Sequence, residues 1–329
     1  MSAGPAAIRF PRPLKRGDVV AVVAPSSGVR DPMHGRLDRS LDMLRERGFI
    51  VREGRSLRQQ LKGASASGRE RAAELMAVLL DPDVAAVMPP WGGELAIEVL
   101  EFLDFERLAA SAPKWFSGFS DLSTVQVPLL IQAGWASLHG PNLMQLWDPA
   151  LDAVSARIFD LWTGAGDRRQ PAAPSTVARR LEGGDLPTVI EGRLIGGCLD
   201  ALSRLAGTPF GDMAVFRGRL AGERPIVFFE IAELPPFEVA RALRGLRLAG
   251  WFEEVAGVVF GRSAVAPEIA SGGDFTELDA IQRALGDLPC PVLLDLDIGH
   301  VAPQWSIVQG ARSRLDVREG QVALIQQLE

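Results

Sequence analysis

The fold is decided by one stretch of the first half of the chain, which reads VAAVMPPWGGELAIE over residues 84–98. It begins as an apolar run of strand length, passes through a stiff Pro-Pro-Trp turn and two glycines, and ends in a helix-favouring run. A strand that breaks through glycines into a helix start leaves several backbone N–H groups without partners. Such a turn suits a negatively charged oxygen, either a bound carboxylate or a developing oxyanion.

Elements of alternating type surround this stretch. Strands are predicted by apolar runs at residues 18–24, 49–51 and 114–118. Helices are predicted by apolar spacing at residues 37–44, 69–80, 97–103 and 122–133. This alternation favours an α/β fold whose parallel sheet is covered by helices. Ligands of such sheets bind beyond the carboxyl ends of the strands, where Ser26, the Gly92-Gly93 turn and the Ser120-Asp121 pair fall.

The composition changes between the two halves of the chain. Residues 163–187 are dominated by Gly, Pro, Ala, Arg and Asp and lose hydrophobic periodicity, which is typical of a linker. We therefore expect an N-terminal α/β domain at residues 1–162 and a C-terminal α/β domain at residues 188–329. The second half opens with another strand that enters a glycine pair, Gly196-Gly197. The active cleft is expected between the two domains.

Composition excludes several classes of function. The chain has 329 residues, 47% hydrophobic and 23% charged, which is the profile of a globular protein. It has no apolar run long enough for a membrane span and no secretory signal, so we expect a cytoplasmic protein without a membrane partner. The net charge of −6 is spread out, which argues against nucleic acid. Two cysteines and three scattered histidines predict neither a disulfide framework nor a metal site, and no cofactor is expected.

Two residues of the second half stand at the ends of apolar strands. Glu230 closes the run at residues 225–230, and His300 follows Gly299 after the run at residues 291–294. A carboxylate that holds a histidine in one tautomer is the orienting half of a Ser-His-acid triad. Taken singly, a glutamate at a strand end is more often a cap or an ion-pair member, and a histidine after a glycine is more often a hydrogen-bonded loop residue.

Six short motifs are each weak signals for a protein family, but their combined order along the chain is specific. In chain order they are Gly92-Gly93, Gly118-Phe119-Ser120-Asp121, His139-Gly140-Pro141, Gly196-Gly197, Phe228-Phe229-Glu230 and Gly299-His300. Their order resembles the LD-carboxypeptidase family of serine peptidases, which includes the microcin C immunity peptidases. The resemblance runs from about Leu14 to the C-terminus.

The resemblance implies a two-domain hydrolase that cuts amide bonds near a free carboxylate, as a homodimer and without a metal. Substrates in the family include the LD-peptide bonds of murein tetrapeptides and acyl-nucleotide antibiotics. The family's acid would fall on Glu230, its histidine on His300, and its oxyanion donors on the backbone N–H groups of Gly92 and Gly93. We therefore expect a hydrolase that acts on a small peptide, amide or amino-acid-like substrate.

The expected departure from the family concerns the nucleophile. We take the family pattern as Gly-Gly-x-x-Ser, which places the nucleophile position on Ala96 in this chain. A methyl group cannot attack a carbonyl, and removing the nucleophile from a triad costs on the order of a millionfold in rate. Cys198, which follows the second glycine pair, is a conceivable substitute.

Three interpretations of Ala96 remain open from the sequence. In the first, Glu94 at the helix start acts as a base or nucleophilic carboxylate with help from His300, its anion stabilised by the helix dipole. In the second, alanine replaces a serine by engineering. In the third, the chain is a non-hydrolytic binding protein or a biosynthetic enzyme on the same scaffold.

The remaining candidate site residues are assigned to substrate binding. Trp91 would form a pocket wall next to Gly92 and Gly93, although packing in the core explains a tryptophan equally well. Ser120 and Asp121 would contact substrate or support the site, and capping of the following helix is the alternative.

Overall fold

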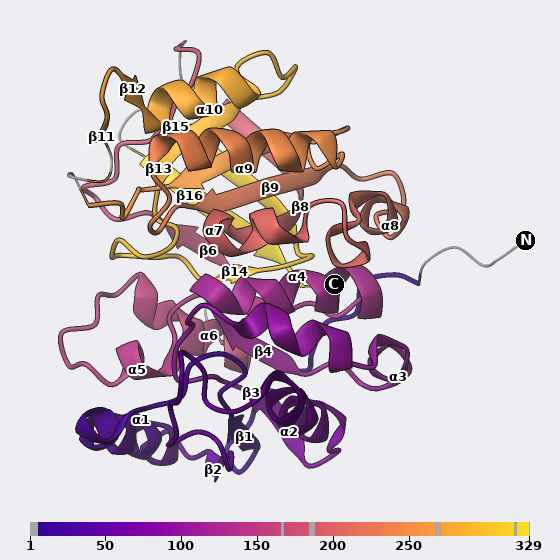
Figure 1. The fold of residues 1–329 in the computed structure, drawn as a ribbon, viewed down its shortest axis with the longest axis vertical. Coiled ribbons are helices and arrows are strands. Elements are labelled where there is room, and N and C mark those ends of the chain that lie inside the picture. Colours follow the sequence, from indigo (N-terminus) through magenta and orange to yellow (C-terminus); the bar gives the residue numbers. More distant parts are fainter. Residues whose placement is uncertain are drawn as a thin grey trace, which may run out of the picture.

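The computed structural model describes residues 6–165, 168–183, 188–266, 269, 271–318 and 321–328. The chain forms two mixed sheets that occupy opposite ends of the molecule (Figure 1). Helix α4 (Ser123–Ala133) lies between the two sheets. The predicted α/β class with two sheet-containing halves is confirmed.

The first sheet has six strands in the order β14-β5-β4-β3-β1-β2. Its strands are β1 (Val19–Val22), β2 (Ile50–Glu53), β3 (Val84–Val87), β4 (Trp115–Gly118), β5 (Leu138–His139) and β14 (Ile307–Val308). β1 to β5 pair in parallel, whereas β14 comes from the far end of the chain and pairs with β5 in antiparallel orientation.

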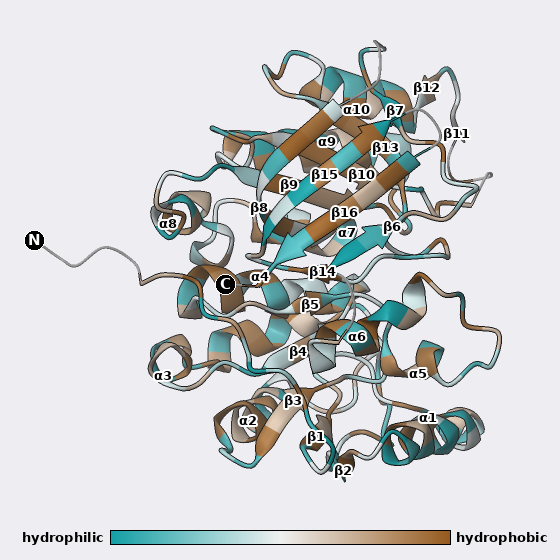
Figure 2. Ribbon diagram, turned by 180° about the vertical axis from the view of Figure 1, so that it is seen from behind, coloured by the Kyte–Doolittle hydropathy of each residue, from teal (hydrophilic) through white to brown (hydrophobic). Residues whose placement is uncertain are grey.

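The second sheet has eight strands in the order β6-β16-β15-β8-β9-β10-β13-β7. Its strands are β6 (Arg169–Pro171), β7 (Arg179–Arg180), β8 (Thr188–Cys198), β9 (Pro225–Glu230), β10 (Gly257–Gly261), β13 (Val292–Leu296), β15 (Arg312–Arg318) and β16 (Gln321–Gln327). The central strands β8, β9, β10 and β13 are parallel, and the flanking pairs are antiparallel. Hydrophobic and hydrophilic residues alternate along β15, as expected for a sheet with one covered face (Figure 2). A small hairpin is formed by β11 (Ser271–Gly272) and β12 (Phe275–Thr276).

Helices connect the strands in both halves. The α-helices besides α4 are α1 (His34–Glu46), α2 (Gly68–Leu80), α3 (Phe105–Ala110), α5 (Leu143–Leu146), α6 (Ile158–Thr163), α7 (Leu199–Leu202), α8 (Met213–Gly218), α9 (Pro236–Leu248) and α10 (Glu277–Leu285). Short 3-10 helices are η1 (Asp31–Met33), η2 (Ala96–Phe102), η3 (Ser120–Leu122), η4 (Ser155–Arg157), η5 (Ser203–Leu205) and η6 (Pro209–Gly211). The expected α-helix at residues 97–103 is thus a 3-10 helix.

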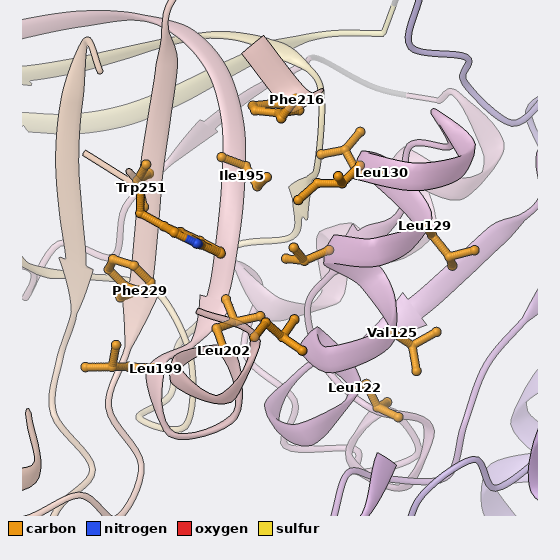
Figure 3. Packing of buried hydrophobic residues seen from close by; sticks show 14 of the residues in the cluster. Leu122, Val125, Leu129, Leu130, Ile195, Leu199, Leu202, Phe216, Phe229 and Trp251 are labelled. Carbon is orange, nitrogen blue, oxygen red and sulfur yellow. The ribbon is translucent and has the colours of Figure 1, made fainter. Parts of the chain in front are cut away.

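Helix α4 joins the two halves through one continuous core. Leu130 points toward Ile195 of the second sheet, whereas Val125 and Leu129 lie on the opposite side of the helix (Figure 3). Ten of its eleven residues are buried, so the helix is enclosed around its whole circumference. A helix of this kind requires packing partners on both sides, which the two sheets provide. The loops at the ends of the two sheets are therefore held in a fixed relation.

The segment expected as a linker takes part in the second sheet. Strands β6 and β7 lie within residues 163–187 and form the two edges of that sheet. Residues 166–167 and 184–187 of this segment lie outside the described residues. The domain limits at residues 162 and 188 stay a prediction. Across the described part of the chain, none of the helices combines the length and apolarity that crossing a membrane requires.

Candidate active site

The first sheet has a switch point between β1 and β3. From its edge the order is β2-β1-β3-β4-β5, so the connections on either side of this point run in opposite directions. Ser26 and Ser27 follow β1, and the Gly92-Gly93 turn follows β3. The Ser27 N–H donates to the Gly92 carbonyl at 3.2 Å. A crevice at the carboxyl edge of the sheet results, and ligands of doubly wound sheets bind at such a crevice.

Ser120 stands on a sharp turn between β4 and α4. Its φ is +66°, and that of Gly118 is +147°. The Asn142 side chain accepts the Phe119 N–H at 3.1 Å, and the Gln126 side chain donates to the Gly118 carbonyl at 2.9 Å. These contacts fix the turn from both sides. A non-glycine residue held at positive φ between a strand and a helix has the geometry of a nucleophile elbow.

Ser120, His300 and Glu230 form a chain of hydrogen bonds between the two sheets. His300 Nε2 lies 3.1 Å from Ser120 Oγ, and Nδ1 lies 2.6 Å from Glu230 Oε2. Glu230 is the last residue of β9 and is fully buried. The His300 side chain, in the loop after β13, is 28% exposed and packs against the Phe119 ring at 4.6 Å. One ring nitrogen therefore faces the serine while the other is held by a buried acid.

The pKa values of this pair shift in opposite directions. Burial raises the pKa of Glu230, but the hydrogen bond and charge of His300, with smaller contributions from His139 and the Ser120 backbone, bring it below its ordinary value. Burial lowers the pKa of His300, but the hydrogen bond and charge of Glu230 bring it above its ordinary value. The geometry thus keeps the acid anionic and makes the histidine a stronger base.

Asp121 ties three strand-end loops together. Its Oδ2 accepts hydrogen bonds from the Ser26 hydroxyl and, at 2.8 Å, from the Ala96 N–H. Burial raises its pKa, while these contacts oppose the rise. Arg71 is also buried and donates to the carbonyls of Pro25 and Leu95, next to the same loops. Asp121 is therefore a structural support of the site.

Two cavities meet at Ser120 and His300. The first, of about 380 Å³, is lined by the Gly92-Gly93 turn and by Trp91, and also by two cationic residues, Arg30 and Arg36. The second, of about 350 Å³, is lined by four acidic side chains, Glu94, Asp121, Asp200 and Glu233, and by one arginine, Arg204. The two sides of the serine thus differ in charge.

The structure places Ser120, and not Ala96 as the expected nucleophile position, against the histidine. Ala96 is fully buried in the hydrophobic core at the start of η2. The serine whose hydroxyl reaches His300 is Ser120, which follows β4 instead of β3. The two candidate positions lie in adjacent strand-end loops, and only the packing of β9 and the His300 loop distinguishes them. The site therefore contains a serine, and the interpretations that start from its absence lose their premise.

The two substitutes for a serine are also disfavoured. Glu94 was expected to be stabilised as an anion by a helix start, but its pKa is raised by burial and by the charges of Glu233, Asp121 and Asp200. The helical turn begins only at Ala96. Cys198 is buried, and burial and the charges of Glu230 and Asp200 raise the pKa of its thiol. A thiolate nucleophile is therefore unfavourable here.

The other predicted site residues are brought together around Ser120. Trp91, Gly92 and Gly93 line the first cavity, and the Trp91 indole donates to the Gly28 carbonyl at 3.2 Å. Sequence reasoning missed Asn142 and Arg71 as supports. It assigned Ser120 to substrate binding, although the Gly-x-Ser between an apolar strand and a helix was the available signal. In the described ranges, no group of three or more His, Cys, Asp or Glu side chains is arranged to hold a metal ion.

Known proteins match both halves of the chain. Residues 20–140 match the LD-carboxypeptidase N-terminal domain, and residues 191–315 match the LD-carboxypeptidase C-terminal domain. A Bacillus subtilis (strain 168) protein named "Probable murein peptide carboxypeptidase" is 26% identical, over 94% of this chain and 92% of that protein.

Solved structures share the fold over nearly the whole chain. A muramoyltetrapeptide carboxypeptidase from Oxalobacter formigenes has a TM-score of 0.72 and 25% identity, covering 94% of this chain and 98% of that chain. An MccF-like protein from Bacillus anthracis str. Ames has a TM-score of 0.79 and 20% identity, covering 96% and 98%. The two domains match in the family's order, and the Bacillus subtilis relative aligns with this chain over most of its own length. The chain therefore belongs to the LD-carboxypeptidase family.

Proposed function

We propose that this protein is a serine peptidase that hydrolyses the amide bond before a C-terminal residue with a free carboxylate, in a murein-type peptide. The observation that carries this proposal is the hydrogen-bonded chain from Ser120 through His300 to Glu230. The names of its relatives, which specify murein peptides, support the substrate class.

The three residues have distinct roles in the proposed reaction. Ser120 Oγ attacks the carbonyl carbon while His300 Nε2 takes the hydroxyl proton, and Glu230 stabilises the resulting imidazolium. When the carbon–nitrogen bond breaks, the same proton passes from Nε2 to the leaving amine. Water then attacks the acyl-serine, His300 accepts a proton from it, and this proton returns to Ser120 Oγ as the acid leaves.

The glycine turn after β3 is the proposed oxyanion site. Gly92 lies against the elbow so closely that a Cβ there would be 2.9 Å from Ser120 Cβ and 3.1 Å from the Asp121 nitrogen. A Cβ on Gly93 would lie 2.4 Å from Ser27 Oγ and 2.5 Å from Ser26 Oγ. Backbone N–H groups of this turn can approach a developing oxyanion because no side chain intervenes.

The charges of the two cavities orient the substrate. A free carboxylate is attracted by Arg30 and Arg36 in the first cavity and repelled by Glu94, Asp200 and Glu233 in the second. We therefore place the released residue, which carries the carboxylate, in the first cavity. The acyl part of the peptide then extends toward the second.

The proposal predicts release of the C-terminal D-residue from a murein tetrapeptide. Mass spectrometry of tetrapeptides that end in a D- or an L-residue, and of one with an amidated C-terminus, measures the products. We expect cleavage of the peptide with a free carboxylate and a C-terminal D-residue. If the substrate carboxylate lies near Arg30 and Arg36 in the first cavity, amidation removes one charge-assisted contact. We therefore expect kcat/KM for the amidated peptide to be lower by at least about tenfold. Absence of cleavage from the whole panel would refute the murein assignment.

The proposed roles also predict the pH dependence of the reaction. His300 must be neutral to accept the serine proton, and its pKa is raised chiefly by Glu230 against the lowering effect of burial. The value of kcat/KM should therefore rise with pH through a pKa above about 6.5, the ordinary histidine value. In Glu230→Gln the charge is removed and burial remains, so NMR titration should find the His300 pKa below that value. An unchanged pKa in this variant would contradict the assignment.

A further inference from the structure

A second histidine lies behind the acid of the triad. His139, at the end of β5, is fully buried, and its Nε2 lies 3.6 Å from Glu230 Oε1. Glu230 therefore lies between two histidines, with Oε2 toward His300 and Oε1 toward His139. Both ring nitrogens of His139, and Glu230 Oε1, have no hydrogen-bond partner among the residues that the structure describes.

Burying these polar atoms without hydrogen-bond partners is energetically unfavourable. A buried carboxylate oxygen without a donor loses its hydration and receives no replacement. A neutral imidazole always carries one N–H, so His139 can supply the missing donor. The distance exceeds a normal N–H···O bond by about 0.6 Å, which a small rotation of either side chain removes.

The surroundings of His139 fix its ring and keep it neutral. The ring lies edge-on to Phe119 at 6.1 Å and to Phe228 at 5.1 Å. The titratable groups that face it are Glu230 on β9 and His300 in the loop after β13. The His139 pKa is lowered to about 4, with burial as the largest influence; the charge of Glu230 opposes this lowering, and the charge of His300 adds to it.

We propose that His139 is a positioning residue, which donates its Nε2–H to Glu230 Oε1 and so holds Oε2 in line with His300. The proposal rests on the triad assigned under the proposed function. Held at both oxygens, the carboxylate cannot rotate away when His300 takes up the serine proton. A neutral donor also adds no second positive charge beside the imidazolium.

The position of His139 in the sheet couples it to the nucleophile as well. It pairs with Gly118 across β4 and β5, two residues before Ser120. It lines neither of the two cavities that meet at the serine. A substitution at position 139 should therefore change kcat and leave KM nearly unchanged.

The test compares His139→Met with His139→Gln in the full chain. Methionine keeps the length and removes the donor, whereas the glutamine amide places a donor near the same point. We expect His139→Met to lower kcat by about 10- to 100-fold, the range for one lost hydrogen bond to a charged group. We expect His139→Gln to recover all but a few-fold of that loss. Trp135→Phe, which removes another buried N–H without a partner from the same segment, serves as the control.

A second measurement does not depend on turnover. The Nδ1–H proton of His300 reports the hydrogen bond to Glu230, and its NMR shift and the titration of His300 can be followed in each variant. Without the donor, Glu230 Oε2 is no longer held in line with His300, and the hydrogen bond that raises the His300 pKa weakens. The His300 pKa should therefore fall in His139→Met and return in His139→Gln. A merely structural role would lower stability and leave both signals unchanged per folded molecule.

The outcomes separate this proposal from the function on which it rests. If Ser120→Ala abolishes cleavage while His139→Met matches Trp135→Phe in kcat and NMR signals, the positioning role is refuted and the peptidase assignment stands. If no peptide is cleaved, the NMR signals alone decide the role of His139. The positioning role would also be refuted if His139→Met and His139→Gln lost kcat to the same extent and the His300 pKa did not change in either variant.

Discussion

Ser120→Ala is expected to abolish peptide cleavage while the protein stays folded and binds its substrate. The hydroxyl that makes the nucleophilic attack is lost, whereas the half-buried position tolerates a smaller side chain. By analogy with other serine peptidases, kcat should fall by about 10⁴- to 10⁶-fold. Mass spectrometry measures the rate, and calorimetry with the tetrapeptide measures binding. A fluorophosphonate probe should label the parent protein and fail to label the variant.

Ala96→Ser is the matched comparison, because it adds a hydroxyl at the position that the sequence pattern favoured. The residue is fully buried in the core, and its N–H is held by Asp121. An added hydroxyl there should give no gain in rate, and should lower the free energy of unfolding by about 1–3 kcal/mol if it stays unpaired. A Ser120→Ala variant that retains full activity, or an Ala96→Ser variant that gains it, would overturn the Ser120 assignment.

Gly299→Ala is expected to disrupt the hydrogen bond between Glu230 and His300, although Gly299 takes no direct part in it. Gly299 has a φ of +91°, and a Cβ there would lie 2.0 Å from Glu230 Oε2. This oxygen accepts the hydrogen bond from His300, so either Glu230 or the His300 loop must shift. A displacement of about 1 Å in a catalytic site costs about 100-fold, and we expect kcat to fall by at least that factor. Steady-state kinetics and the His300 Nδ1–H shift measure the effect.

Gly222→Ala separates the steric effect from backbone strain. Gly222 has a nearly equal φ of +89°, but a Cβ there would meet no atom within 4 Å. Both alanines should destabilise the protein by about 1–2 kcal/mol through their left-handed backbone, which thermal unfolding measures. Only Gly299→Ala should lose activity. Equal kinetics in the two variants would show that the approach of Gly299 to Glu230 does not matter for the reaction.

The sequence predicted most of the secondary structure and two of the three residues of the proposed catalytic chain. Apolar runs such as residues 18–24 and 114–118 contain β1 and β4, because a continuous apolar run of strand length can be recognised from the local sequence. Glu230 and His300 were found because one ends an apolar strand and the other follows one, where side chains reach the cleft. The glycine turn at residues 92–93 was identified from its lack of side chains, and it lines the cavity beside Ser120.

The choice between Ser120 and Ala96 depended on the tertiary structure. Local pattern offers two strand-end turns, after β3 and after β4. The Gly-x-Ser of the second turn makes it a candidate, but the pattern does not show which turn faces the histidine. His300 lies 180 positions beyond Ser120 and comes from the other sheet. The relation of the two sheets is set by the packing of α4 between them. The sequence by itself therefore determined which residue types could react, because side-chain chemistry and strand ends are local properties. Only the tertiary structure decided which strand-end residue meets the histidine, because that contact depends on how two distant sheets pack together.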